Sequence, residues 1–596
     1  KERLFKTTFF LIIAMKYAII MLFFGRKFRA VSIDNLKTEV AMKFLSFILI
    51  TVSLLLLIFS GSATAAGPDS FVFVRQSFDG TAPVFITEKD RKLPLFEIIP
   101  DGDTVAAEIA KTIGGGISKV SLKLGACAKN FMLGEINAGR SSQTAEVFCE
   151  PLYIHLVKGG NMPKRGFFLK KDGAPAGKSF AHYIEMPPEP VAFESIFAHE
   201  NGHLIDAYIK DADFEFSADR FVHTAPAISD FWTAFIEGWG EHFETMMVDM
   251  SSTPACRNLY TFDGVKGRAY FSQLQDIASL SHKSKRYYWV KSNLFAFKRI
   301  PVSAQLERLS GGDGLKQYLY NHFNSNFDAS ELKNIQQMLS TEGLVATLFY
   351  RMVNDEKIQS NYIDDIEFYE KFNGGKLNGT PREIFSPLEN AYLKIIAAKY
   401  RLFKNYEKRE KIEEAIVFID FIKQYASLFS GDARDALSGY CMNVYFAGVW
   451  EDAAACYRNN YCASHLTLVD PGAMQAAFGK CFQRIQQTAD KLGTSNVELL
   501  SKYASNPLWI VNDTFNLCDE KDKFFVSINI NSAEEFELAS ISFLTKRQAA
   551  DIISYRENKG FFASVDDLKK VPSLEEKQIK EFERMRKLFL EKNSRR

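Results

Sequence analysis

The feature that most restricts this chain is a His-Glu-x-x-His pattern, formed by His199, Glu200 and His203 within an apolar stretch. Apolar residues recur around it at helical spacing, after a proline-rich segment at 186–190, so we expect a helix there. Residues four apart on a helix share a face, and two neutral imidazoles can therefore reach one Zn²⁺ ion. Glu200 is placed to take a proton from a water molecule on that ion.

The alternative is a helix whose two histidines bind nothing. The chain has only nine histidines in 596 residues, so a chance match inside so suitable a helix is a weak explanation. Gly202 lowers the stability of the helix. We interpret it as a place where another backbone approaches the metal-binding turn closely.

A third ligand is expected, because catalytic zinc usually has three ligands from the protein. The metzincin class is excluded, since Ile209 stands where that class has its third histidine. A second amphipathic helix, predicted at 231–247, carries Glu237 and Glu241 on one face. We expect Glu237 to be the third ligand and Glu241 to accept the remaining N–H of a ligand histidine.

Two other interpretations of these acidic residues stay open. Glu237 and Glu241 can belong to a solvated acidic face, although Gly238 and Gly240 favour close contact with another segment. Glu342, which also precedes a glycine on a predicted helix, is the rival third ligand.

The segment 199–208, with the downstream pair Glu237-Gly238, resembles gluzincin peptidases of the anthrax lethal-factor type. The resemblance covers about residues 150–250 and implies Zn²⁺ and peptide-bond hydrolysis. It also implies ligands His199, His203 and Glu237, and Glu200 as the base. Asp206 matches an aspartate that follows the motif, and we expect it to support the ligands from behind.

The resemblance has two further implications for the substrate. The edge strand before the metal helix lines the cleft in gluzincins, so residues 180–186 would pair with an extended peptide. The exopeptidase signature Gly-x-Met-Glu-Asn is absent, so recognition of a free amine is not indicated.

A proton donor that stabilises the tetrahedral oxyanion is a common part of such sites. The sequence offers His223, His242, Tyr208 and Tyr260, and we assign the role to His223.

The expected fold class is α+β. A zincin-like domain at 66–270 precedes a mainly helical domain at 271–520 and a small all-α domain at 525–592. We expect helices at 103–113 and 410–429 and a possible boundary at 374–381. Strands are predicted at 71–75, 82–87, 117–124, 152–156, 165–169 and 180–186.

The N-terminal part is expected to direct export. Residues 42–65 have a basic start, an apolar run and a small-residue end, which is typical of a signal peptide, and we interpret 1–41 as upstream translation. The apolar run at 8–24 is short and contains Lys16, so we expect no stable membrane span in the mature chain. The protein would be periplasmic or extracellular.

Export changes the interpretation of the eight cysteines. In an oxidising compartment an even number suggests disulfides, and we consider Cys127 with Cys149 and pairs within 441–481 plausible. The alternative is that several are buried free thiols.

The segment 525–592 resembles the competence-type paired helix-hairpin-helix domain. In that family Gly-x-Gly hairpins turn their backbone N–H groups to a DNA phosphate. The corresponding positions, 543–545 and 573–575, hold no glycine, and Glu575 would repel phosphate. We therefore expect the fold with a protein-docking or spacer role and do not expect DNA binding. The resembling elements lie at 528–531, 549–556, 560–562 and 565–568.

The net charge of +1 gives the chain no general attraction for nucleic acid or anionic membranes. The predicted function is thus an exported zinc-dependent peptidase acting on a peptide or protein. The alternatives are an inactive zincin-like scaffold and an extracellular DNA-binding protein that acts through its C-terminal domain.

Overall fold

The computed structural model describes most of the chain between residues 70 and 594. The segments expected to be upstream translation and signal peptide lie outside it, as do His223 and the cysteines of 441–481. The described residues are 70–210, 225, 231–251, 253–260, 287, 289–291, 293–296, 338–407, 417–440, 443–444, 516–518, 527–530, 538, 541, 543–559, 562 and 564–594.

Six strands form one mixed sheet in the order β1-β6-β8-β7-β5-β4. Because β1 also pairs with β5, five of the strands close into a ring, and β4 is attached to β5 on the outside. Pairs β1–β6, β6–β8 and β5–β7 are parallel and the others antiparallel. The strands are β1 (Phe71–Gln76), β4 (Phe85–Glu88), β5 (Arg91–Ile98), β6 (Leu152–Leu156), β7 (Met162–Lys171) and β8 (Ala174–Met186).

Side chains alternate between the two faces of these strands. Tyr153 and Tyr183 join a small aromatic cluster with Phe96 and Phe167 on one face. Their neighbours on the other face, which include Ile154 and Ile184, belong to the large core that the helices share. The second face of the sheet therefore packs against the helices that share this core.

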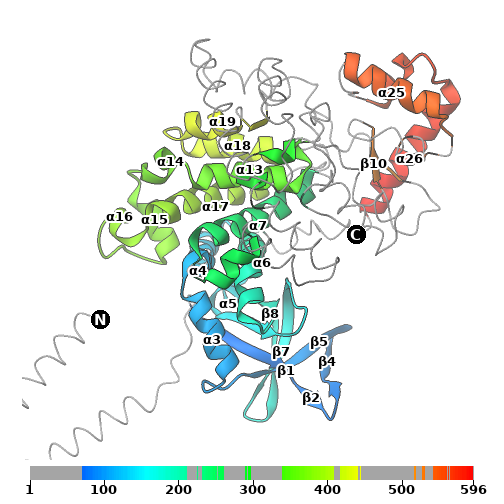
Figure 1. Ribbon diagram of the computed structural model, residues 1–596. Helices are drawn as coiled ribbons and strands as arrows, with labels where there is room; N and C mark the ends of the chain where they lie inside the picture. Colours follow the sequence, from blue (N-terminus) through cyan, green and yellow to red (C-terminus); the bar gives the residue numbers. More distant parts are fainter. Residues whose placement is uncertain are drawn as a thin grey trace, which may run out of the picture. The chain divides into compact units, whose positions relative to one another are not determined.

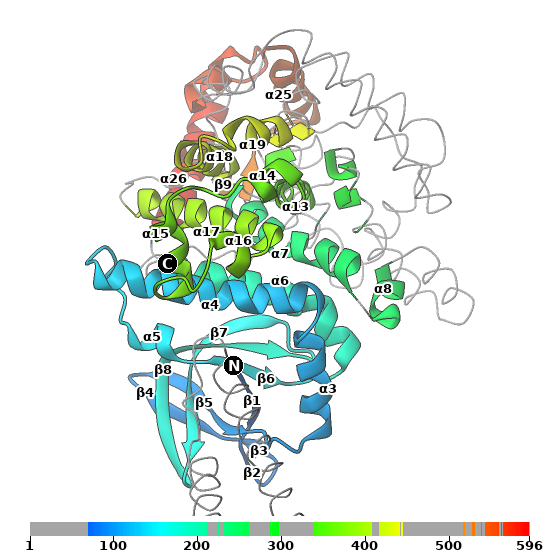
Figure 2. The ribbon, with the colours of Figure 1, turned by 90° about the vertical axis from the view of Figure 1, so that its left-hand side faces the viewer.

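Two long helices cover that second face, as Figure 2 shows: α4 (Gly116–Asn137) and α6 (Pro190–Ile209). Asn201 on α6 donates from Nδ2 to the carbonyl and hydroxyl oxygens of Ser121 on α4, both at 2.7 Å. The buried amide thus fixes the register between the two helices.

The strand predicted at 117–124 is wrong, because these residues open helix α4. Ile117, Ser121 and Leu124 are buried on one helical face, and Ala128 continues it. The spacing of four and three residues fits a helix as well as the short alternation fits a strand. The length of the apolar face, which runs on to Met132, decides for the helix.

Further helices extend the same continuous core beyond α6 (Figure 1). The longest are α7 (Phe231–Met250), α13 (Glu342–Val353), α17 (Pro387–Tyr406), α18 (Val417–Leu428) and α19 (Ala433–Tyr440). The loop at 374–381 connects elements that share this core. The remaining elements are β2 (Phe78–Asp79), β3 (Ala82–Pro83), α3 (Thr104–Ile113), α5 (Glu146–Cys149), α8 (Pro254–Tyr260), η3 (Leu294–Ala296), α14 (Glu356–Ser360), α15 (Ile366–Asn373) and α16 (Pro381–Ile384).

Local sequence explains where α17 begins. Ser386 and Glu389 form a capping box: the Glu389 carboxylate accepts from the Ser386 N–H at 2.7 Å, and the Ser386 hydroxyl accepts from the Glu389 N–H. Pro387 occupies the first helical position, where no N–H is needed. This start fixes the beginning of the helix that carries Lys399 into the core.

The C-terminal residues have a core of their own, which includes Ile552, Phe562, Leu568 and Phe582. Its elements are β9 (Asn516–Cys518), β10 (Ser527–Asn529), α25 (Lys546–Lys559), η9 (Val565–Lys570) and α26 (Glu576–Ser594).

The predicted α+β class is confirmed: a sheet, a helical region and a C-terminal helical unit follow one another. The predicted Cys127–Cys149 disulfide is absent, and both are free thiols, because Cys127 faces the core from α4 while Cys149 is exposed at the end of α5. Within the described ranges no helix is long and apolar enough to cross a membrane.

Candidate metal centre

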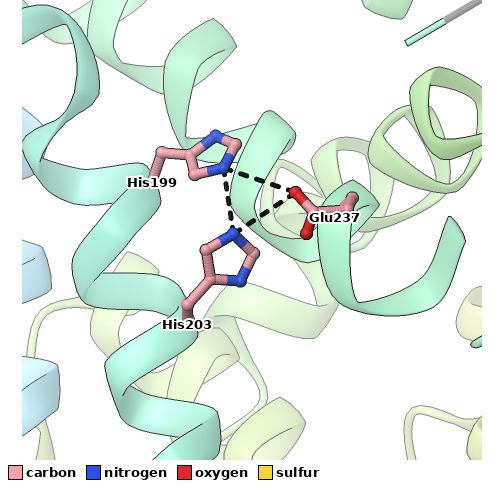
Figure 3. A group of neighbouring side chains, drawn as sticks. All are labelled: His199, His203 and Glu237. Carbon is pink, nitrogen blue, oxygen red and sulfur yellow. Dashed lines mark hydrogen bonds and ion pairs between the residues drawn. The ribbon is translucent and has the colours of Figure 1, made fainter. Parts of the chain in front are cut away.

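Helices α6 and α7 bring together the three side chains that the sequence predicts as ligands (Figure 3). His199 and His203 lie one turn apart on α6, with their Nε2 atoms 3.0 Å from each other. Glu237 reaches them from α7, with Oε2 at 3.7 Å from His199 Nε2 and 3.4 Å from His203 Nε2. Two rings and one carboxylate therefore point at a common position.

These distances fit a zinc ion. Tetrahedral ligands at the usual bond lengths of about 2.1 Å lie about 3.4 Å from one another, and the three separations fall close to that value. Two imidazole nitrogens that face each other also need a proton or a cation between them, since lone pairs repel. The chemistry of the donor set, two nitrogens and one oxygen, is typical of catalytic zinc.

Glycines make the close approach of the two helices possible. A Cβ on Gly240 of α7 would lie 2.7 Å from His199 Nε2. A Cβ on Gly202 of α6 would lie 2.9 Å from the ring of Phe243. The indole N–H of Trp239 donates to the Gly202 carbonyl at 3.0 Å, which ties the two helices between the ligands. The predicted close contact with another segment at Gly238 and Gly240 is confirmed. The backbone approach predicted at Gly202 is wrong, because the side chains of Phe243 and Trp239 fill that space.

The carboxylate behind His199 is Glu244 and not Glu241, which corrects the prediction. Glu244 Oε1 lies 2.9 Å from His199 Nδ1, which is an ion-pair distance, although the angles of a hydrogen bond are not met. Burial lowers the pKa of His199, but the carboxylates of Glu237 and Glu244 raise it well above its ordinary value. A proton held on Nδ1 by Glu244 leaves the lone pair of Nε2 directed at the other ligands.

Asp206 supports the α6 helix by a different contact from the one expected. Its Oδ2 accepts from the ammonium group of Lys399 at 2.9 Å, and both side chains are buried. No bond from Asp206 to a ligand histidine occurs among the described residues. Burial lowers the pKa of Lys399 to about 8.

Glu200 lies beside the three predicted ligands and is 7% exposed. Burial raises the pKa of its carboxyl group, while the neighbouring His199 and His203 act in the opposite direction. A carboxylate with a raised pKa holds a proton more readily, which is what a general base near neutral pH requires.

Glu342, His242 and Tyr208, the described alternatives for the third ligand and the oxyanion donor, lie outside the group formed by His199, His203 and Glu237. Glu342 begins α13, and the group of potential ligands found in the described residues does not include it. His242 is fully buried, with Nε2 3.0 Å from the Tyr392 hydroxyl. Tyr208 is buried against His182 and Lys129. The first choice, His223, and the side chain of Tyr260 lie outside the described part.

Strand β8 is not an edge strand where it meets α6, so the predicted pairing of 180–186 with a peptide is wrong. Tyr183 pairs with Tyr153 of β6 on one side, and also with Lys164 of β7 on the other. The closure of the five strands into a ring uses both edges. The sequence correctly places a strand just before the α6 helix, but it does not show whether that strand has a free edge.

In the C-terminal unit, one backbone N–H at each predicted hairpin is bound by a glutamine side chain of the helix that follows. The Thr545 N–H donates to Gln548 Oε1 at 3.0 Å, and the Glu575 N–H donates to Gln578 Oε1 at 3.1 Å. Gln548 also donates from Nε2 to the Ser573 carbonyl, which links the hairpins. Backbone N–H groups that already donate to these side chains are not available to a phosphate.

Comparison with known proteins identifies one motif. The helix-hairpin-helix motif family matches residues 523–588, which confirms a helix-hairpin-helix motif in the C-terminal unit. The competence-type pairing of two such motifs stays a prediction. No curated protein and no solved structure matches the chain.

Proposed function

We propose that this protein is a zinc-dependent peptidase whose centre is held by His199, His203 and Glu237. The observation that carries the proposal is the convergence of these three side chains at 3.0–3.7 Å from two separate helices. A solvated acidic face would not turn a buried carboxylate toward two partly buried imidazoles.

When bound there, Zn²⁺ would supply Lewis-acid activation of water and of the scissile carbonyl. Glu200 takes the proton of the attacking water as its oxygen adds to the carbonyl carbon. The same carboxyl group then gives the proton to the amine as the C–N bond breaks. Glu244 keeps the His199 ring in one orientation and tautomer throughout.

The test is peptide cleavage by the full chain and by Glu200→Gln. The variant should bind as much zinc as the wild type and cleave a peptide library about 10²–10⁴-fold more slowly. Glu194→Gln is the matched control, because Glu194 is a buried carboxylate on the same helix that accepts from Ser251. It should keep its activity. Equal cleavage by Glu200→Gln and the wild type would refute the assigned base.

An inactive zincin-like scaffold is the first rival. It would bind zinc and cleave nothing, so the wild-type measurement separates it from the proposal. The burial of Glu200, which raises the pKa of its carboxyl group, favours the active enzyme.

For the C-terminal unit we propose a protein-docking role. The internal capping of both hairpins by Gln548 and Gln578 supports it, since the phosphate-facing donors are already used. Duplex DNA binding is the rival. Export through residues 42–65 remains a prediction from sequence, because those residues lie outside the described part of the chain.

A further inference from the structure

A buried lysine joins the two helices that carry the proposed ligands. Lys399 of α17 is fully buried, and its ammonium nitrogen lies 2.9 Å from Asp206 Oδ2 on α6. The same nitrogen lies 4.2 Å from the ring centre of Trp239 on α7 and 4.8 Å from that of Phe235. One cation thus contacts a carboxylate on one ligand helix and aromatic faces on the other.

The position of these contacts relative to the ligands is informative. Asp206 follows His203 by three residues, and Trp239 follows Glu237 by two. Trp239 also donates to the carbonyl of Gly202, beside His203. A buried ion pair is costly unless its geometry is well satisfied, so its location behind two ligands calls for an explanation.

Two buried polar atoms next to this pair complement each other. Within the described residues, Asp206 Oδ1 and His203 Nδ1 are both shielded from solvent and have no hydrogen-bond partner. Residues three apart on a helix are neighbours, with Cβ atoms about 5–6 Å apart. Nδ1 carries the proton in the tautomer that leaves Nε2 free for a metal ion, and a carboxylate oxygen only accepts.

We propose that Lys399 is a positioning residue for the metal centre. Its ammonium group fixes Asp206 so that Oδ1 accepts the Nδ1–H of His203 through one bridging water. Its contact with Trp239 fixes this unit against the helix that carries Glu237. His203 thereby has a carboxylate behind it, as His199 has Glu244. The inference rests on the proposed zinc centre.

The test is zinc affinity of the metal-stripped full chain, measured by competition with a chelator and accompanied by melting temperature. Lys399→Met with Asp206→Leu removes both charges and replaces them with apolar groups of similar size. This double variant should fold, yet bind Zn²⁺ about 10–100-fold more weakly. Lys399→Met with Asp206→Asn keeps an acceptor oxygen but lacks the ammonium group that fixes it, so this variant should recover only part of the affinity at a similar melting temperature.

The matched control is the second buried pair on α17, Lys394 with Asp432. Lys394→Met with Asp432→Asn should lower the melting temperature and leave the zinc affinity unchanged. Wild-type affinity in either double variant would overturn the positioning role of Lys399. Equal affinities of the two double variants, with Asp206→Leu and with Asp206→Asn, would overturn it as well. Failure of the wild type to bind zinc would instead overturn the proposed function.

Discussion

Gly240 leaves space for the ring of His199: a Cβ at residue 240 would lie 2.7 Å from His199 Nε2, 2.8 Å from Cδ2 and 3.0 Å from Cε1. The helix that supplies Glu237 therefore lies directly against a ring supplied by α6. Packing, and not only the three donor atoms, defines the centre.

Gly240→Ala should displace the His199 ring and weaken zinc binding by at least about tenfold, since metal sites tolerate little movement of a ligand. Helix propensity alone would favour alanine by about 1 kcal/mol. Gly439→Ala on α19 is the control, because a Cβ there has no atom within 4 Å. It should leave zinc affinity unchanged. Zinc titration measures the affinity of both variants. Unaltered binding by Gly240→Ala would contradict the close packing of α7 against the His199 ring.

The carboxylates Glu241 and Glu244 can be separated by their glutamine variants. Glu244→Gln weakens the hold on the His199 Nδ1 proton, and the zinc affinity should fall about 10–100-fold. Glu241→Gln should have a smaller effect on affinity. The same zinc titration compares them. A larger loss in Glu241→Gln would restore the assignment made from sequence.

Stability at acidic pH should depend on His182 in β8. Burial lowers the pKa of His182 from 6.5 to about 3, so the unfolded chain binds this proton first. As pH falls from about 6.5 toward 3, the folded state of the zinc-free protein therefore loses stability. His182→Asn should show a shallower decline in melting temperature over this interval. Parallel declines for variant and wild type would exclude this contribution.

Duplex DNA should not be retained by the full chain at physiological salt. The donors of Thr545 and Glu575 are used within the hairpins, and Glu575 and Glu576 are exposed acids at the start of α26. A gel-shift assay with random duplex measures this. A salt-sensitive shift that disappears in a Lys546→Glu, Arg547→Glu variant would instead assign DNA binding to this unit.

The helix periodicity and the i, i+4 spacing predict His199, Glu200 and His203 as one site. The usual number of protein ligands of catalytic zinc and the resemblance to gluzincins add Glu237. Glu241 and Glu244 could not be told apart, because both lie on the Glu237 face of α7 and only the way α6 and α7 pack together selects between them. That packing depends on glycines whose partners are remote in sequence.

Contacts between residues far apart in the sequence could not be predicted for the same reason. Lys399 follows Asp206 by 193 positions, and the sequence around either residue does not indicate that the two form an ion pair. The ring closure of β1 with β5 likewise could not be inferred from alternation within single strands, so β8 was expected to be an edge. In α4, a short stretch of apparent alternation concealed a helical face that is visible only over the full 22 residues.

The central claim is that His199, His203 and Glu237 bind one zinc ion. X-ray absorption at the zinc edge, with elemental analysis of the purified full chain, tests it most directly. One zinc per chain is predicted, with two imidazole nitrogens and one carboxylate oxygen at about 2.0–2.2 Å, and loss of the metal in His199→Ala with His203→Ala. A zinc-free protein, or a zinc signal without imidazole that persists in the double variant, would contradict the account.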